Sequence, residues 1–374
     1  MNFEFGEDQI MVRDQARGFL ASNCPPAVVR QVLESDVLYA AELWQQVVDL
    51  GWTGTVIPEQ YGGLGLSYLE LVVIAEELGR ACAPLPFASS VYLATEALLA
   101  AGSEAQKLAW LPRLAAGEVI GGLAYAEGNG ETTAATLATS VSDGKISGSK
   151  SVVADAQLAQ LMIVLASSEQ GDGASLYIVP MDQGGVDCEA VATIDPSLNH
   201  ANVSFDGAPA ELLGAAGEGF ALLRQILDRA AVLMAWEQLG GAEASLNMAK
   251  DYAMQRYAFG RPIGSYQAIK HKLAEMYVKN TLARSNAYYG AWALNTNAHD
   301  LPLAAATARV GSTQAYHYAS KENIQTHGGM GYTWEFDCQF YYRRARVLAL
   351  AIGSERLWQD KLISASDHVL AEQA

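Results

Sequence analysis

Residues 255–267, QRYAFGRPIGSYQ, carry two arginines at an interruption of a long helical pattern. Arg256 precedes the Phe-Gly pair at 259–260, and Arg261 follows it. A guanidinium group presents a fixed fork of donors that suits paired anionic oxygens, and a few local arginines can bind an anion even on an acidic chain. The spacing therefore indicates either a turn that binds an anionic group or a helix hairpin with two surface arginines.

Motifs that would define other chemistries are absent from the sequence. There is no HExxH, no GxSxG and no Walker A pattern. GGMGYT at 328–333 follows a helical pattern rather than a strand, so it is not a dinucleotide fingerprint. The histidines form no pair with metal-ligand spacing, and the cysteines are far apart, so buried free thiols are predicted rather than a metal site or a disulfide. The cysteines are Cys24, Cys82, Cys188 and Cys338.

The composition argues against further classes of function. The chain has 374 residues, 51% of them hydrophobic, with a net charge of −17 and a pI near 4.7. It can bury a large core, and without a basic stripe we expect no nucleic-acid partner. The N-terminus has no secretory signal pattern, and no uncharged apolar run reaches about 18 residues. We therefore expect a cytoplasmic protein with no membrane span.

The elements that position these residues fall into three parts. Helical periodicity runs from 7 to 115, short β runs begin near Val119, and long amphipathic helices return from Glu218. Helices and strands are segregated, which argues against a Rossmann enzyme. We predict a mainly α fold with a central β domain, an antiparallel barrel or sandwich, and domains at 1–117, 118–214 and 215–374. One final helix is predicted near 344–365.

Two stretches together resemble the acyl-CoA dehydrogenase family of flavoproteins: RYAFGRPIGSYQAIKHKLAEM at 256–276 and IQTHGGMGYTWEFDCQFYYRRAR at 324–346. The resemblance covers essentially the whole chain. It implies an acyl-CoA dehydrogenase-like fold of a helical bundle, a small β-barrel and a four-helix bundle, assembled as dimers or dimers of dimers. It also implies FAD at the subunit interface and an acyl-CoA substrate. A carboxylate then removes the α-proton, the flavin accepts the β-hydride, and an electron-transfer flavoprotein takes the electrons.

The resemblance gives the helix break a role in binding a neighbour's cofactor. In this family the break crosses to another subunit and holds the FAD bound there. Arg256 matches the residue that meets the pyrophosphate, while Phe259 and Gln267 match contacts on the adenosine side. Gln325 and Gly329 match further contacts, with glycine allowing close backbone approach. The resemblance therefore predicts an arm that serves the FAD of another subunit.

The segments that would bind the chain's own flavin depart from the family pattern. Where the family has T-E-P-x-x-G-S-D, residues 126–132 read AEGNGET, so Ala126 replaces the first hydroxyl. Where the family has K-x-W-I-T-N, residues 150–155 read KSVVAD. Val152 and Ala154 therefore stand in place of a stacking tryptophan and a hydrogen-bonding threonine. The ring of a flavin bound by this chain would lack these contacts.

The catalytic base of the family is also missing from its two usual positions. The glutamate position near the C-terminus holds Ile352, and the alternative position on the first long C-terminal helix holds Ala230. The arginine that often follows is Ala231. Isoleucine and alanine cannot accept a proton. Asp228 matches a family residue near the CoA, but its short side chain points from a different turn, so it is only a substrate-binding candidate.

Two further glutamates are candidates for functional groups. Glu355 would share a face with Ile352 if the segment were helical, which makes it a candidate for a displaced base. The alternative is a solvated glutamate paired with Arg356 or Arg346. Glu237 stands in an apolar helix and is expected to make a buried polar contact in the bundle.

The losses are selective, because contacts for a neighbour's flavin persist while those for the chain's own flavin and the base are gone. This pattern is similar to the non-catalytic chain of bacterial heteromeric acyl-CoA dehydrogenases of the steroid-CoA type, which pair with a homologous subunit. Two alternatives stay open: a self-sufficient homomeric dehydrogenase that uses Glu355, and a non-enzymatic acyl-CoA-binding member of the fold. The sequence leaves the acyl group and the electron acceptor open.

Overall fold

The computed structural model describes residues 5–128, 130–168 and 173–373, which form two compact units. The first comprises Met1–Gln31, Tyr68–Ala83 and Ala231–Ala374, and the second comprises Val32–Ser67 and Pro84–Ala230. Each unit therefore combines segments that are distant in the sequence. The domain boundaries expected at 117/118 and 214/215 remain a prediction. Within the described residues, no helix is both long enough and apolar enough to span a membrane.

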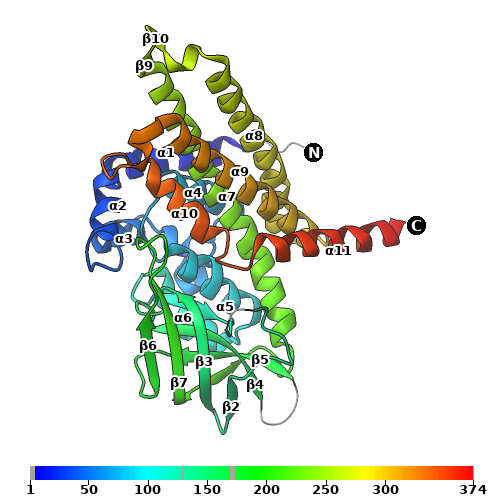
Figure 1. Cartoon of the computed structure of the whole chain (residues 1–374). Helices are drawn as coiled ribbons and strands as arrows, with labels where there is room; N and C mark the ends of the chain where they lie inside the picture. Colours follow the sequence, from blue (N-terminus) through cyan, green and yellow to red (C-terminus); the bar gives the residue numbers. More distant parts are fainter. Residues whose placement is uncertain (1–4, 129, 169–172, 374) are drawn as a thin grey trace. The chain divides into compact units, whose positions relative to one another are not determined.

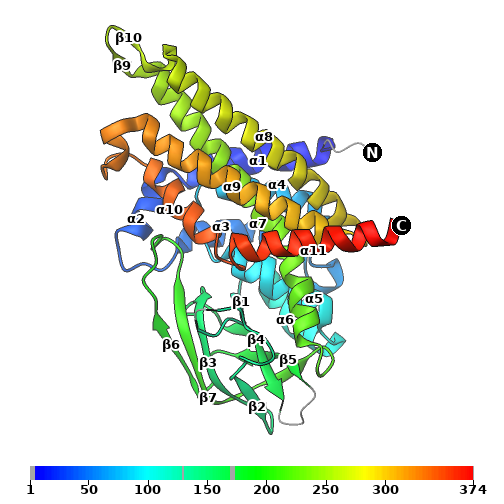
Figure 2. The same cartoon turned by 45° about the vertical axis from the view of Figure 1, so that its right-hand side comes forward.

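The first unit is helical apart from one short hairpin. Its central helix is α7 (Gly219–Gln255), which belongs to this unit from Ala231 onward. In both views the hairpin of β9 (Tyr257–Ala258) and β10 (Arg261–Pro262) forms the tip where α7 and α8 meet (Figures 1 and 2). The other elements are α1 (Glu7–Asn23), α4 (Tyr68–Arg80), η4 (Ile263–Ser265), α8 (Gln267–Thr296), α9 (Leu301–His327), η5 (Gly328–Tyr332), α10 (Cys338–Leu348) and α11 (Glu355–Gln373).

Helices α4 and α7 cross at two glycines. A Cβ atom at Gly79 would lie 1.8 Å from the carbonyl oxygen of Glu237, and one at Gly240 would lie 1.8 Å from the carbonyl oxygen of Glu76. Any side chain at either position would therefore force the helices apart. Glycine ordinarily weakens a helix interior, so its presence here reflects this close approach.

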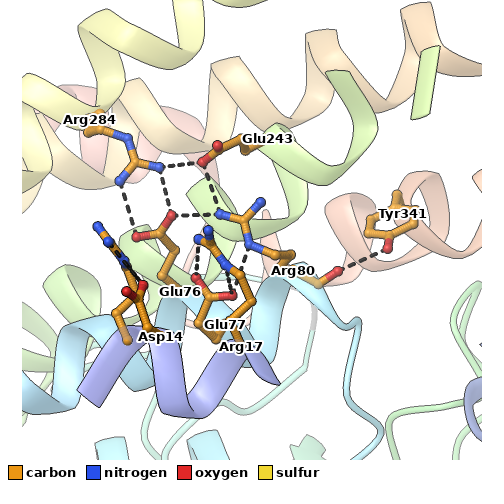
Figure 3. A network of polar contacts seen from close by, with 9 residues as sticks. Asp14, Arg17, Glu76, Glu77, Arg80, Glu243, Arg284 and Tyr341 are labelled. Atoms are coloured by element: carbon orange, nitrogen blue, oxygen red, sulfur yellow. Dashed lines mark hydrogen bonds and ion pairs between the residues drawn. The ribbon is translucent and has the colours of Figure 1, made fainter. Parts of the chain in front are cut away.

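An ion-pair network joins α1, α4, α7 and α8 beside this crossing (Figure 3). Arg284 donates to Glu76 and to Glu243, each at 2.7 Å, and Arg80 also reaches both carboxylates, at 2.9 and 3.0 Å. Burial alone would raise the pKa of Glu243, but the guanidinium groups of Arg80 and Arg284 hold that pKa below its ordinary value. The network therefore fixes charged side chains inside the bundle. Its six members are Arg17, Glu76, Glu77, Arg80, Glu243 and Arg284.

The expectation of one final helix over 344–365 was wrong, because the chain breaks between Leu348 and Glu355. Two buried side chains bond the backbone at this break. Trp358 donates from its indole nitrogen to the carbonyl of Ile352 at 3.2 Å, and Arg309 donates to the carbonyl of Leu348. Gly353 adopts φ of +109°, which favours glycine. Ile352 thus lies in a turn and not on a helix.

The second unit combines short helices with an eight-stranded sheet. The strand order is β6-β7-β3-β2-β4-β5-β8, with β1 paired to β4. The strands are β1 (Gly121–Ala124), β2 (Ser140–Ser142), β3 (Lys145–Ala154), β4 (Leu161–Ser168), β5 (Ala174–Pro180), β6 (Val186–Ala190), β7 (His200–Pro209) and β8 (Glu211–Leu213). The helices are α3 (Ala41–Asp49), η1 (Trp52–Gly54), η2 (Glu59–Tyr61), η3 (Ala88–Thr95), α5 (Glu96–Ala101) and α6 (Glu104–Ala115), and α2 (Pro26–Leu33) bridges the two units in sequence.

A mainly α fold with a central β domain is confirmed, but the sheet is not wholly antiparallel. Strands β1 and β2 each pair with β4 in parallel. Alternating residues of β3, β4, β5 and β7 form the core of this sheet, among them Ile146, Val164 and Val203. All four cysteines are free, as expected; Cys188 is half-buried and the other three are buried.

Candidate functional site

The break after α7 is a tight β-hairpin. Phe259 and Gly260 occupy its turn with φ of +52° and +82°, the signs that a type I′ turn requires at both central residues. The Ile263 backbone N–H donates to the carbonyl of Arg256 at 2.8 Å, and the Tyr266 hydroxyl donates to the carbonyl of Ala258 at 2.9 Å. These bonds hold the hairpin in one shape, and they explain why the chain restarts as a helix directly afterwards.

The Phe259 side chain is presented outward at a conformational cost. Its side chain is 98% exposed, and positive φ is uncommon for a bulky residue. A strained, fully exposed aromatic ring has no stabilising role in this chain alone, so the strain points to a contact made with another molecule.

The two arginines of the hairpin differ in their surroundings. The Arg261 guanidinium lies 4.0 Å from the centroid of the Tyr266 ring, which holds it against its own hairpin. Arg256 is exposed, and among the described residues no side chain pairs with its guanidinium. Arg256 is therefore the one of the two whose donors are available to an outside anion.

The remaining arm residues are also directed to open space. Gln267 is the first residue of α8, Gln325 lies in the last turn of α9, and both are exposed. At Gly329, in η5, a Cβ atom would meet nothing within 4 Å, so a ligand can approach the backbone there. We refer to Arg256, Phe259, Gln267, Gln325 and Gly329 as the arm.

The loop at 126–128 of the second unit is anchored to β3 but offers no side-chain donor at the expected positions. The Ser151 backbone N–H donates to the carbonyl of Ala126 at 2.9 Å, and the Ser151 hydroxyl accepts from the N–H of Gly128 at 3.1 Å. Asn129, the next residue, lies outside the described residues. Ala126 and Ala154 have no polar side-chain atom, so they cannot replace the hydroxyls that they stand for.

Val152 occupies a β-bulge between β3 and β7. Its φ is +53°, an outlier for a β-branched residue, and its side chain is 52% exposed. Its N–H donates to the Asn202 side chain at 3.0 Å, which holds the bulge. The backbone thus turns residue 152 outward, but valine has no ring to stack on a flavin.

One buried ion pair supports this loop and was not predicted. Lys150 Nζ lies 2.5 Å from Glu127 Oε1, and the lysine side chain is fully buried. Burial alone would raise the pKa of Glu127, but Lys150 and the backbone donors of Ala138 and Thr139 lower it to about 2. The loop at 126–128 is therefore held in place by an ion pair, although the side chains that would contact the flavin ring in the family pattern are absent.

Neither expected base position can take part in proton transfer. Ala230 and Ala231 are buried within α7, and Ile352 is buried in the turn before α11. Glu355 begins α11, so the assumption of a helical face shared with Ile352 was wrong. Its carboxylate accepts from the side-chain amides of Gln314 and Gln359 at 2.8 and 2.9 Å.

The partners expected for Glu355 are engaged elsewhere. Arg356 lies 3.9 Å from Asp360, and the Arg346 guanidinium lies over the Tyr342 ring. Glu237 is buried, with its carboxylate 4.0 Å from Arg344, as expected of a buried polar contact; burial raises the pKa of Glu237 despite that arginine. Asp228 is buried in α7, and its proposed role near CoA stays a prediction.

Comparison with known proteins identifies the family. Residues 6–118 match the family described as Acyl-CoA dehydrogenase, N-terminal domain, and residues 217–365 match Acyl-CoA dehydrogenase, C-terminal domain. The chain is 30% identical to acyl-CoA dehydrogenase IpdE2 of Mycobacterium tuberculosis over 94% of each protein. The chain belongs to the acyl-CoA dehydrogenase family. FAD is the cofactor of this family, and its members are oxidoreductases.

Two solved structures extend the comparison to assemblies of unlike chains. One is a variant of the Tcur3481–Tcur3483 steroid acyl-CoA dehydrogenase, with a TM-score of 0.87 at 26% identity over 98% of this chain and 99% of that chain. The other is the ChsE4–ChsE5 complex of Mycobacterium tuberculosis, with a TM-score of 0.86 at 25% identity over 97% and 98%. This member of the acyl-CoA dehydrogenase family is thus similar to chains of two structures that are each named for two proteins.

FAD can be tested against the residues of each unit separately. The arm offers an unpaired guanidinium, an exposed ring and an open glycine, which fit a phosphate-bearing ligand with an aromatic base. At the positions that stand for the family's ring contacts, Ala126, Val152 and Ala154 have apolar side chains, which do not fit a ring that needs hydrogen bonds. The arm therefore fits FAD, and the ring-binding positions of this chain do not.

Proposed function

We propose that this chain is the non-catalytic subunit of a heteromeric acyl-CoA dehydrogenase. It lends its arm to the FAD held by a homologous partner subunit, and that partner supplies the base. The observation that carries the proposal is a contrast between two residues. Arg256 is exposed and has no side-chain partner within the described part of the chain, whereas Ile352 is buried where the family has a carboxylate. The likeness to two-chain dehydrogenases supports it.

The reaction is the α,β-desaturation of an acyl-CoA thioester. FAD, when bound, supplies the acceptor for the β-hydride. In this chain Arg256 would hold the anionic pyrophosphate with charge-assisted hydrogen bonds, and Phe259 would cover the adenosine. Gly329 would let the backbone approach the cofactor closely. These residues bind and orient, and none of them moves a proton.

The proposed substrate is an acyl-CoA with a bulky, steroid-like acyl group, and the proposed electron acceptor is an electron-transfer flavoprotein. The steroid acyl-CoA dehydrogenase among the similar structures supports this substrate class. Ala230, Ala231 and Ile352 carry no carboxylate or guanidinium that would have to reach the reacting atoms of a small substrate. A chain without a catalytic base can therefore leave space for a large acyl group. Asp228 is retained as a candidate for contact with CoA.

Arg256→Ala tests the role of the arm in the assembled complex with its homologous subunit. A charge-assisted contact to phosphate contributes roughly 1.5–3 kcal/mol, so FAD should bind about 10- to 150-fold more weakly in a calorimetric titration. Arg356→Ala is the matched control, because it removes the same charge from another exposed arginine, which lies on α11 with a side chain that is 90% exposed. It should leave FAD affinity unchanged. Equal FAD affinity for wild type and Arg256→Ala would show that the arm is wrongly assigned.

Glu355→Gln separates this proposal from a self-sufficient enzyme. Glutamine keeps the size and most of the hydrogen bonding but cannot accept the α-proton. With a partner-supplied base, desaturation by the complex should stay within a few-fold of wild type. A fall of about 10²-fold or more, with FAD still bound, would make Glu355 the base and the chain a homomeric dehydrogenase.

A further inference from the structure

The two halves of the arm come from segments that are far apart in the sequence. Arg256 and Phe259 follow the end of α7, while Gln325 and Gly329 flank the end of α9. A single extended ligand can be held by both halves only if their separation is fixed, since binding a loosely placed donor loses the benefit of preorganisation.

Three rings join the two helix ends. Tyr252 of α7 stacks on His327, the last residue of α9, with centroids 4.1 Å apart and planes at 28°. Phe336, in the segment before α10, packs edge-on against both rings, at 6.0 Å from Tyr252 and 5.5 Å from His327. Such offset and edge-to-face arrangements are the favourable geometries for aromatic pairs. We call these three residues the ring cluster.

The cluster is connected directly to the arm on each side. The carbonyl of Tyr252 accepts from the Arg256 backbone N–H at 2.8 Å, the last helical hydrogen bond before the hairpin. His327 stands between Gln325 and Gly329 in the chain. A change in the stack would therefore move the points at which the two halves of the arm join α7 and α9.

The imidazole of His327 is held in one orientation. Its Nδ1 lies 2.9 Å from the carbonyl oxygen of Asn323, which can only accept, so Nδ1 carries the proton. Burial lowers the pKa of His327, which favours the neutral ring that stacks on tyrosine. Neither the family's chemistry nor the arm residues named above account for this cluster.

We propose that the ring cluster is the positioning element of the arm, setting the distance between Arg256 and the Gln325–Gly329 segment so that both contact one FAD. This inference rests on the proposed function, because it concerns FAD held in the complex with the homologous subunit. Tyr252, His327 and Phe336 do not touch the ligand; they act through the two segments that do.

The test is a double-mutant cycle on FAD affinity in the assembled complex. Tyr252→Leu should weaken FAD binding about tenfold, because the stack is lost and the halves no longer share one spacing. Tyr252→Phe keeps the ring and should stay within twofold, since the tyrosine hydroxyl has no partner among the described residues. His327→Leu removes the stack from the other side and should match Tyr252→Leu.

The second part of the double-mutant cycle repeats the Tyr252→Leu substitution in the Arg256→Ala variant. With one half of the arm already removed, Tyr252→Leu should cost less than twofold more, because there is no longer a spacing to maintain. Equal weakening in both backgrounds, or none in either, would overturn the inference, since general destabilisation acts regardless of Arg256. If Arg256→Ala itself has no effect, the proposed function fails instead, so the two failures are distinguishable.

Discussion

Lys150→Met tests the buried ion pair that supports the loop at 126–128. The Lys150 side chain is 0% exposed, and it pairs with the carboxylate of Glu127, whose side chain is 11% exposed. Methionine fills a similar volume without a charge. The substitution therefore leaves the Glu127 carboxylate with its two backbone donors, Ala138 and Thr139, and with no cation.

The magnitude follows from the pKa of Glu127, which is lowered from 4.5 to about 2. At 1.36 kcal/mol per pKa unit, this difference corresponds to about 3 kcal/mol of stabilisation of the charged form. Burial lowers the pKa of Lys150 even though Glu127 raises it, so the lysine gains less from the pair than the carboxylate does. The backbone donors of Ala138 and Thr139 also lower this pKa and remain in the variant, so about 3 kcal/mol is an upper bound on the loss caused by removing the lysine, not the net value of the pair.

The assay is urea-induced unfolding at pH 7 and pH 3. A carboxylate with a lowered pKa stabilises the fold above its unfolded pKa of 4.5, and this contribution is lost as pH falls towards 2. The deficit of Lys150→Met should therefore be about 1–3 kcal/mol at pH 7 and clearly smaller at pH 3. Lys145→Met, on the exposed face of the same strand, is the control and should change stability by less than about 0.5 kcal/mol.

Two results would refute this reasoning. One is a deficit below about 1 kcal/mol at pH 7, which would mean that the pair contributes little. The other is a deficit that does not change with pH, which would mean that methionine disturbs packing and not charge. Adding Glu127→Gln to Lys150→Met should recover part of the loss, because no uncompensated charge then remains.

Three further predictions concern stability, each measured by chemical unfolding. Gly79→Ala should destabilise by more than about 3 kcal/mol because its Cβ would strike the α7 backbone, whereas Gly18→Ala, in open space on α1, should stabilise by about 0.5–1 kcal/mol; similar effects would refute the close crossing. Arg284→Met should cost roughly 2–4 kcal/mol and Lys279→Met less than about 0.5 kcal/mol, since only Arg284 pairs with a buried carboxylate, that of Glu76. Val152→Gly should stabilise by about 1 kcal/mol by relieving positive φ, and any loss would contradict the strain.

The order of elements and the break after α7 could be predicted because their signals are local, whereas the β-hairpin that forms at this break was not predicted. The helical, β and helical periodicities follow from apolar spacing, and Phe-Gly between two arginines marks a turn wherever it stands. The break at 349–354 could not be predicted, because the run VLALAI at 347–352 continues a helical pattern. The helix ends there because Arg309 and Trp358, which are distant in the sequence or lie beyond the break, bond the backbone carbonyls of Leu348 and Ile352.

Parts of the site were missed for the same reason. The arm residues were predicted from the family resemblance, but the stack of Tyr252 on His327 joins positions that no local pattern connects. No sequence pattern indicated that Lys150 is buried, because a lysine in a strand is ordinarily exposed and its partner Glu127 lies in a loop. Strands β2 and β8 are three residues each, too short for a period-2 pattern to register.

Flavin stoichiometry tests the central claim most directly. The chain would be purified alone, titrated with FAD, and its bound flavin determined from visible absorbance per chain; the same measurement would follow on the complex with a homologous acyl-CoA dehydrogenase subunit. We expect weak, substoichiometric FAD on the isolated chain and about one FAD per pair of chains in the complex, because Val152 and Ala154 cannot hold the ring. A yellow homomer with one tightly bound FAD per chain would contradict it.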